Sequence, residues 1–543
     1  MVFARRSTTL LAAIIASCAM VLSLTACTSD NKTVVDGQTT VTSNSAGGVA
    51  VFTPSDGITL NQQVPLNKWA KLVPDLTKAL VDAGFKKGDI DHTTSDSLAK
   101  QSRAIQDFVV DHLSNNTTDD SGIAIAPDNM TLLVAPVVEA DASTRQYGDY
   151  VSQNLSTNDA TDEGATSDGE SSEDDSSKDD SSNTESDSTA SDEQAQAVDR
   201  LVSSLKLAKE SGMHVVLLGN SIEGYKPDAF VKFSDAQTIG KLQAEKMVSK
   251  LKLDKASKDN PKYIEVLLPY TAVDEKGNAN DSTFAQEAFR GIWQVLGSYY
   301  QKGVVESPSG TLDGKSTEND WQAVAYDAAK EGSTAKVLDK RLAKTDGQST
   351  LTRIDGIITM NDYIASEVVK ELDDLGYTGS AADINPQITI SGIVGNITGK
   401  KDLSRDAVPD PIKSPENDNA NDSSSSDDDA DEDTSASDKD RDSQWPLVTG
   451  YGAYVSNIPS IVNGKQWMTG MEDRQTIATD IAQACAKLNK DEALNSMPSI
   501  RNSEVGGVKK IPTISEPLLA VSASNLKSAL IDPGYISLAD AGL

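Results

Sequence analysis

The sequence predicts an α/β protein with two lobes, each built around a parallel β-sheet. Short apolar runs alternate with amphipathic stretches along most of the chain, and this alternation is typical of βαβ units. Once an N-terminal leader, a polar tether and two acidic tracts are set aside, roughly 430 residues remain, more than a single hydrophobic core normally holds. We therefore expect two lobes rather than one.

The expected elements follow from these periodicities. The short apolar runs predict strands at 57–60, 131–135, 214–218, 263–267, 356–359 and 387–393. The amphipathic stretches predict helices at 67–83, 97–113, 194–211, 239–251, 282–299 and 363–375. Gly84, Gly212 and Gly376 stand where three of these helices should end in a left-handed residue. In open α/β sheets ligands bind beyond the carboxyl ends of the strands, so the loops that follow the strands are the places to search.

The N-terminus predicts a lipoprotein signal peptide over residues 1–26. Arg5 and Arg6 precede an apolar run at 10–24, and the run ends in Leu24-Thr-Ala-Cys27. A buried helix is the alternative, but the basic start and the small residues before the cysteine favour processing. We expect Cys27 to be lipidated, residues 27–55 to hold this cysteine and a flexible tether, and the acyl chains to fix the protein to the outer face of the cell membrane.

Two acidic tracts carry most of the formal net charge of −33. Fourteen acidic residues stand against one lysine between 159 and 193, and twelve stand against two basic residues between 416 and 442. High like charge and low hydrophobicity predict disordered inserts at about 155–195 and about 414–443. The remaining body is mildly acidic, which argues against a nucleic-acid partner.

Few residues are available for catalysis or metal binding. The chain has three histidines, His92, His112 and His214, and none has a second metal ligand at the usual spacing. No nucleophile-elbow or phosphate-binding glycine motif is present. Apart from Cys27, the processed chain would hold one cysteine, Cys485. We expect a protein without metal, cofactor, disulfide or enzymatic activity.

Five short segments follow one another along the chain in a familiar order. They are 67–69 (NKW), 231–245 (VKFSDAQTIGKLQAE), 359–362 (TMND), 461–469 (IVNGKQWMT) and 511–517 (IPTISEP) with 525–526 (NL) following. With these segments the chain resembles the type I periplasmic sugar-binding proteins, in particular their xylose-binding branch. The resemblance implies two Rossmann-like lobes joined by a three-strand hinge, closing on a sugar that is handed to an ABC permease in the membrane.

The resemblance also implies domain boundaries. The N-terminal lobe would span 56–232 and the C-terminal lobe 233–466, each with one acidic insert. Residues 467–500 would return to the N-terminal lobe, and 501–543 would belong mainly to the C-terminal lobe. Crossovers are expected near 233–234, near 467–468 and before the C-terminal segment.

Two pairs of neighbouring residues are the leading ligand candidates. Trp69 offers an apolar face for a sugar ring and Lys68 stands beside it, although a core position for Trp69 is the alternative. Asn361 and Asp362 follow a strand, where their amide and carboxylate can bridge hydroxyls; capping of the next helix is the alternative.

Further candidates are Asp235, Asn280 and Tyr451. Asp235 stands at the first crossover, where a turn role is the alternative, and Asn280 precedes a helix. Tyr451 belongs to the run 450–453 (GYGA), which replaces the Gly-Gln-Asp-Ala run of the family.

Several positions depart from the xylose-binding pattern. The family's Tyr-Asp-Arg run is replaced by Leu218-Gly-Asn220, its asparagine after the crossover by Ala236, and a lysine by Glu472. A buried sugar hydroxyl without a partner costs about 1–3 kcal/mol. We therefore expect the ligand to be a monosaccharide or short oligosaccharide other than xylose, or another small polar solute. We also expect the protein to be a monomer. A surface interaction protein that has lost sugar binding and a ligand sensor for a signalling receptor remain the alternatives.

Overall fold

The computed structural model describes residues 32–35, 38–41, 46–55, 65–115, 125–138, 144–150, 153–156, 185–273, 280–343, 351–382 and 444–543. It divides into two units, 1–45 and 46–543. The first contains an antiparallel pair, β1 (Lys32–Val35) with β2 (Gln38–Val41). The second contains all the elements below. The predicted signal peptide, Cys27 and most of both acidic tracts lie outside the described residues.

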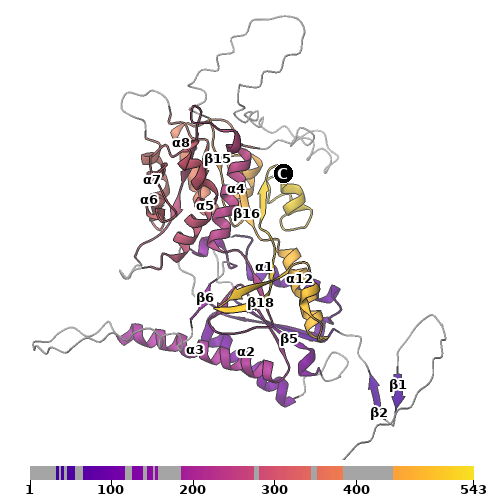
Figure 1. The fold of residues 1–543 in the computed structure, drawn as a ribbon. Helices are drawn as coiled ribbons and strands as arrows, with labels where there is room; N and C mark the ends of the chain where they lie inside the picture. Colours follow the sequence, from indigo (N-terminus) through magenta and orange to yellow (C-terminus); the bar gives the residue numbers. More distant parts are fainter. Residues whose placement is uncertain are drawn as a thin grey trace, which may run out of the picture. The chain divides into compact units, whose positions relative to one another are not determined.

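A seven-stranded sheet forms the first half of the larger unit (Figure 1). All its strands are parallel except β17, which pairs antiparallel with β18. Their order across the sheet is β17 (Ile500–Val505), β18 (Val508–Ser515), β9 (Ala229–Lys232), β7 (His214–Leu218), β5 (Met130–Val134), β3 (Gly48–Pro54) and β4 (Ile90–Ser95).

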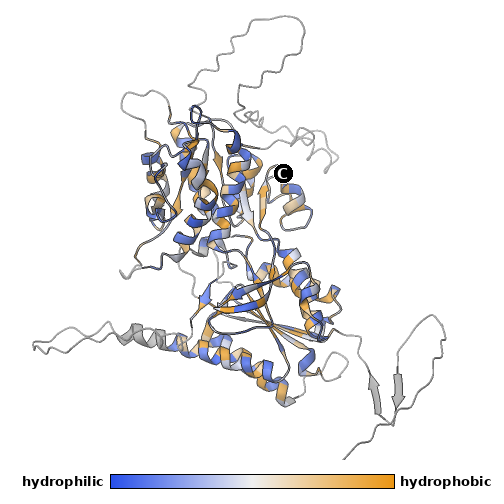
Figure 2. Ribbon diagram, viewed as in Figure 1, coloured by the Kyte–Doolittle hydropathy of each residue, from blue (hydrophilic) through white to orange (hydrophobic). Residues whose placement is uncertain are grey.

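Helices cover both faces of this sheet, so its central strands read as continuous apolar runs. Alternate residues of β3 enter different cores: Val49 and Val51 face α1 (Trp69–Asp82) and α12 (Arg474–Leu488). Ala50 and Phe52 face α2 (Leu98–Asn115) and α3 (Glu185–Glu210). Figure 2 shows the resulting division, with hydrophobic strands and helices whose outer faces are hydrophilic.

A four-stranded parallel sheet forms the second half, in the order β12 (Val305–Glu306), β10 (Lys262–Val266), β14 (Gly356–Ile358) and β15 (Leu447–Val448). One face packs on α4 (Ala236–Lys250) and α5 (Thr283–Gln301). The other packs on α7 (Ser333–Arg341) and α8 (Asp362–Leu375). A parallel pair, β11 (Leu268–Pro269) with β13 (Ala325–Tyr326), lies beside α6 (Trp321–Val324).

Three crossovers connect the halves. Residues 233–235 lead from β9 of the first sheet to α4 of the second half, and 472–473 lead from β16 (Met468–Met471) to α12. Residues 516–518 lead from β18 to β19 (Leu519–Ser522), which pairs antiparallel with β16. The predicted fold class is thereby confirmed in two features: two α/β halves with parallel sheets, and three crossovers between them.

Both sheets use the same order rule. In each, the first strand lies between the second and the third, so the direction in which successive strands are added reverses between β3 and β5 and between β10 and β14. Ligands of open α/β sheets bind at such reversals, beyond the carboxyl ends of the strands. The remaining short elements are β6 (Asn154–Leu155), β8 (Ser221–Ile222), α11 (Ile458–Val462), the 3₁₀ turns η1 (Lys87–Asp89), η2 (Pro127–Asn129), η3 (Thr144–Tyr147), η5 (Leu253–Lys255), η6 (Val455–Asn457) and η7 (Leu494–Ser496), and the π-turn η8 (Lys527–Ile531).

Most predicted elements are confirmed. β5, β7, β10 and β14 match the expected strands, and the six helices lie where the amphipathic stretches predicted them. Gly84, Gly212 and Gly376 have φ values of 103°, 97° and 94°, as a left-handed helix end requires. The predicted strands at 57–60 and 387–393 lie outside the described residues.

Four boundaries need correction. The second crossover was expected near 467–468 but lies at 472–473, because residues 468–471 first form β16 and pair with β19. The first strand, β3, runs through 48–54 within the predicted tether, because its residues are apolar enough to be buried on both faces. The first insert does not occupy all of 155–195, since β6 ends at Leu155 and the α3 backbone is helical from Glu185. Residues 501–515 were expected mainly in the C-terminal lobe, but β17 and β18 extend the first sheet through pairing with β9.

Candidate functional site

Lys68 and Trp69 lie at the start of α1, the helix that follows β3. The Lys68 ammonium is 2.8 Å from the Asp149 carboxylate, and the Trp69 backbone N–H donates to the other oxygen of that carboxylate at 3.0 Å. The Trp69 ring is 2% exposed and packs edge-on against Tyr150 and Phe233, with centroid distances of 5.1 and 5.7 Å. Trp69 therefore has the core packing that was its alternative reading.

Asn361 lies just past the carboxyl end of β14 and is fully buried. Its side-chain oxygen accepts from the Ile364 N–H at 2.9 Å and so caps α8. Its amide nitrogen donates to the Gln146 side chain at 3.0 Å. Asn361 thus combines the capping role with a polar contact that reaches beyond its own half of the molecule.

Asp362 is buried among neutral hydrogen-bond donors. Its carboxylate accepts from the Tyr454 N–H at 2.9 Å, the Thr469 hydroxyl at 2.8 Å and the Gln466 amide at 2.7 Å. Burial raises the pKa of this carboxyl to about 6, against the hydrogen bonds that lower it. The carboxylate fixes residues 454–469 against the start of α8.

Tyr451 is fully buried at the junction of two crossovers. Its hydroxyl accepts from the Asn67 amide at 3.0 Å, is hydrogen-bonded to the Ser234 hydroxyl at 2.5 Å and donates to Glu472 at 3.4 Å. Glu472 also accepts from the Ser234 N–H at 2.5 Å, and burial raises the pKa of this carboxyl to about 7. We call Asn67, Ser234, Tyr451 and Glu472 the hinge cluster.

Asp235 and Asn280 make local contacts. Asp235 caps α4 by accepting from the Thr238 N–H at 2.7 Å, and it pairs with Lys232 at 2.8 Å. The Asn280 amide donates to the Thr271 carbonyl at 2.9 Å and holds the loop before α5. The fold therefore brings Lys68 and Trp69 together around Asp149 and places Asn361 against Gln146, whereas the contacts of Asp235 and Asn280 named here are local.

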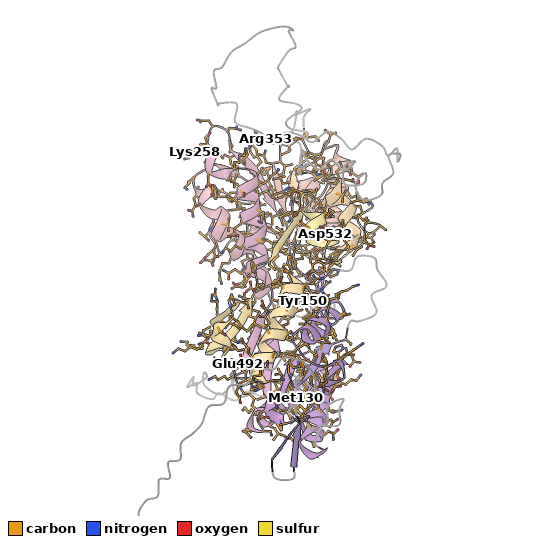
Figure 3. The ribbon with its side chains drawn as sticks, turned by 90° about the vertical axis from the view of Figure 1, so that its right-hand side faces the viewer. Met130, Tyr150, Lys258, Arg353, Glu492 and Asp532 are labelled. Carbon is orange, nitrogen blue, oxygen red and sulfur yellow. The ribbon has the colours of Figure 1, made fainter. Side chains whose placement is uncertain are left out.

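Residues 146–150 contact both groups of predicted residues, and sequence reasoning missed them. We call them the bridging segment. Gln146 bonds to Asn361, and the Gln146 carbonyl accepts from the Tyr454 hydroxyl at 2.6 Å. At its other end, Asp149 binds Lys68 and Trp69, as described above. In Figure 3, Tyr150 lies between Met130, which begins β5, and Arg353, which precedes β14.

The backbone on either side of the bridging segment is anchored to the first half by the Asn220 side chain. The Asn220 amide donates to the Pro136 carbonyl at 2.9 Å, and its side-chain oxygen accepts from the Gln153 N–H at 3.0 Å. β6 then pairs with β8. Asn220 belongs to the run that departs from the family pattern. This departure, together with the tyrosines at 147 and 150, was the only sign in the sequence that residues 146–150 take part in the site.

The described residues lack two features that other functions would need. Among the ranges given above, no group of three or more His, Cys, Asp or Glu side chains is placed to hold a metal ion. Within those same ranges, no helix is both long and apolar enough to cross a membrane.

Comparison with known proteins gives solved structures of low sequence identity that include sugar-binding proteins of ABC transporters. No family model matches the chain, and no curated protein sequence matches it. An ABC transporter solute-binding protein from Clostridium phytofermentans with bound β-D-glucose has 17% identity and a TM-score of 0.44, covering 91% of this chain and 99% of that one. A carbohydrate transporter solute-binding protein from Chloroflexus aurantiacus in complex with D-glucose has 18% identity and a TM-score of 0.43, covering 92% and 98%. A periplasmic ribose ABC transporter protein from Conexibacter woesei has 14% identity and a TM-score of 0.42, covering 90% and 96%.

Proposed function

We propose that this protein is an extracytoplasmic solute-binding lipoprotein that captures a sugar, or another small polar solute, for import by an ABC permease. The observation that carries the proposal is the pair of α/β halves with the same strand order, joined by three crossovers. Such halves place the carboxyl ends of their strands where a ligand binds, and a hinge between them allows closure. The protein would act by binding, without catalysis.

The chemistry of the residues beyond the strands supports a polar, uncharged solute. The Asn361 oxygen caps α8, and its amide N–H, once separated from Gln146, is a donor that a solute hydroxyl can accept from. Two tyrosines adjoin this position: Tyr147 follows Gln146, which Asn361 contacts, and the Tyr451 carbonyl accepts from the Asp362 N–H at 2.9 Å. Polar groups that orient a ligand beside aromatic surface are typical of small-molecule sites.

The proposal is tested by thermal unfolding of the full chain with pentoses, hexoses, polyols and nucleosides. A ligand at a hundred times its Kd adds about 2.7 kcal/mol to the free energy of unfolding, so a binder raises the Tm. We expect one class of compound to do so and Asn361→Ala to abolish the shift. Asp313→Ala is the control, because it removes a carboxylate that accepts from two backbone N–H groups on an exposed turn and leaves the predicted ligand residues and the crossovers intact. Unchanged Tm values across the panel would contradict sugar binding.

A second candidate function is a surface interaction protein that retains the fold without transport. The observation that favours it is the bridging segment, whose side chains already satisfy Lys68 and Asn361. This candidate predicts that no compound of the panel binds to the wild-type chain or to any variant that frees these residues.

A further inference from the structure

The bridging segment lies where the proposed function needs an open site. Its Asp149 meets the residues that follow β3, and its Gln146 meets the residue that follows β14. Each of these two strands borders the point at which the strand order of its sheet reverses, and an α/β protein binds its ligand at such a point. One short segment of the first half therefore bridges the ligand-binding edges of both halves.

Tyr147, one of the two tyrosines of the bridging segment, packs into the core of the second half. Tyr147 is 1% exposed and belongs to the core that α4 and α5 build on the second sheet. Its ring centroid lies 4.7 Å from that of Phe284, at the start of α5. The segment thus supplies an amide, a carboxylate and an aromatic ring. A bound sugar would meet the same site with hydroxyl groups and an apolar ring face, so the segment occupies the contacts that a sugar would make.

The backbone of the segment is fitted closely to the start of α1. Gly148 has φ of 96°, and a Cβ at this position would come within 2.6 Å of the Asn67 carbonyl oxygen. The Asp149 N–H donates to the same carbonyl at 2.8 Å, and the Tyr150 hydroxyl donates to the Lys68 carbonyl at 2.5 Å. The fit depends on glycine at 148, because any other residue adds strain and a collision with backbone.

We propose that the bridging segment is a tethered occupant of the interlobe site, which a solute must displace in order to bind. The inference rests on the proposed function. Solute affinity then equals the intrinsic affinity multiplied by the fraction of molecules whose segment is released, so stabilising the segment weakens binding. The competing arrangement is a fixed wall, in which the segment stays in place and forms one side of the site.

Gly148→Ala in the full chain tests the proposal, because it disturbs the segment without removing any side chain that faces the ligand residues. Gly534→Ala is the matched control: Gly534 also has positive φ, 79°, but its added Cβ meets nothing within 4 Å. Calorimetric titration with D-glucose, D-ribose, L-arabinose and myo-inositol should give at least tenfold tighter binding of one compound to Gly148→Ala than to wild type or Gly534→Ala. Should Gly148→Ala fail to fold, Gln146→Ala replaces it, since it removes the bond to Asn361.

Hydrogen exchange of the wild-type chain supplies a second measurement. The proposal expects the amide of Asp149, which is bonded to Asn67, to exchange faster when the chain is saturated with the bound compound. Equal affinities of wild type and Gly148→Ala, or slower exchange of this amide on binding, would overturn the displacement model and leave the proposed function standing. No binding by any of these chains contradicts the proposed function as well.

Discussion

At the scale of single residues, two carboxyl groups stand out because the fold buries them among neutral donors. Asp362 binds a backbone N–H, a hydroxyl and an amide, and Glu472 binds Ser234 and the Tyr451 hydroxyl. Burial disfavours their charged forms, which is why both pKa values are raised. A raised pKa means that the folded chain holds its proton at a pH where the unfolded chain has lost it.

The pH dependence of stability follows from that difference. The contribution of protonated Glu472 to the free energy of unfolding is fully present below its ordinary pKa of 4.5 and is lost as the pH rises to about 7. The contribution of Asp362 is lost in the same direction between pH 3.8 and about 6. We expect the free energy of unfolding from urea titrations to fall over this window, by up to about 1.4 kcal/mol per pH unit for each group. Glu472→Gln should flatten the slope between pH 4.5 and 7.

Glu492→Gln is the control, since this carboxyl is exposed and its pKa is lowered by a hydrogen bond from Lys487 and by the charge of that lysine. An identical slope in wild type and Glu472→Gln would contradict the account of the hinge cluster.

At the scale of elements, the second half depends on the close approach of α4 and α5. A Cβ at Gly240 would lie 2.2 Å from the Ala288 carbonyl oxygen, and one at Gly291 would lie 2.0 Å from that of Gln237. Both contacts are with backbone, which cannot move without separating the helices. Glycine is retained here although alanine favours a helix by about 1 kcal/mol.

Gly291→Ala should therefore destabilise the protein by about 1–3 kcal/mol, the usual cost of overpacking, despite the gain in helix propensity. Gly297→Ala in the same helix is the comparison, because its added Cβ would meet the Trp293 side chain rather than backbone. Chemical denaturation of both variants measures the difference. Equal stability of the two would show that the α4–α5 approach is not the constraint.

Most helices and strands were predictable from the sequence, but the contacts of the predicted ligand residues were not. Helices such as α5 and α8 show a 3.6-residue period over many residues, and buried strands such as β7 are continuous apolar runs. β3 was missed because it directly follows a polar stretch that reads as a tether. The contacts of Asn361 with Gln146 and of Tyr451 with Asn67 join residues 215 and 384 positions apart, which no local period encodes.

At the scale of the whole molecule, the proposed function requires attachment to a membrane. We expect the wild-type chain, expressed in a lipoprotein-processing bacterium, to be recovered with the membrane fraction, and Cys27→Ser to be recovered without it. The reason is that each buried methylene of an acyl chain contributes about 0.8 kcal/mol to membrane binding. Cys485→Ser is the control, because this buried thiol lies within α12. Membrane recovery of Cys27→Ser would remove the anchor from the proposal.

The pairing of β16 with β19 restricts how the halves can reorient. β16 leads into one crossover and β19 leaves another, and four residue pairs from Met468–Ser522 to Met471–Leu519 bind them as an antiparallel ribbon. Two of the three connections are therefore coupled mechanically, and the third, at 233–235, is bonded to the first of them through Ser234 and Glu472. Because all three connections are held together in this way, we expect them to bend as one when the halves reorient.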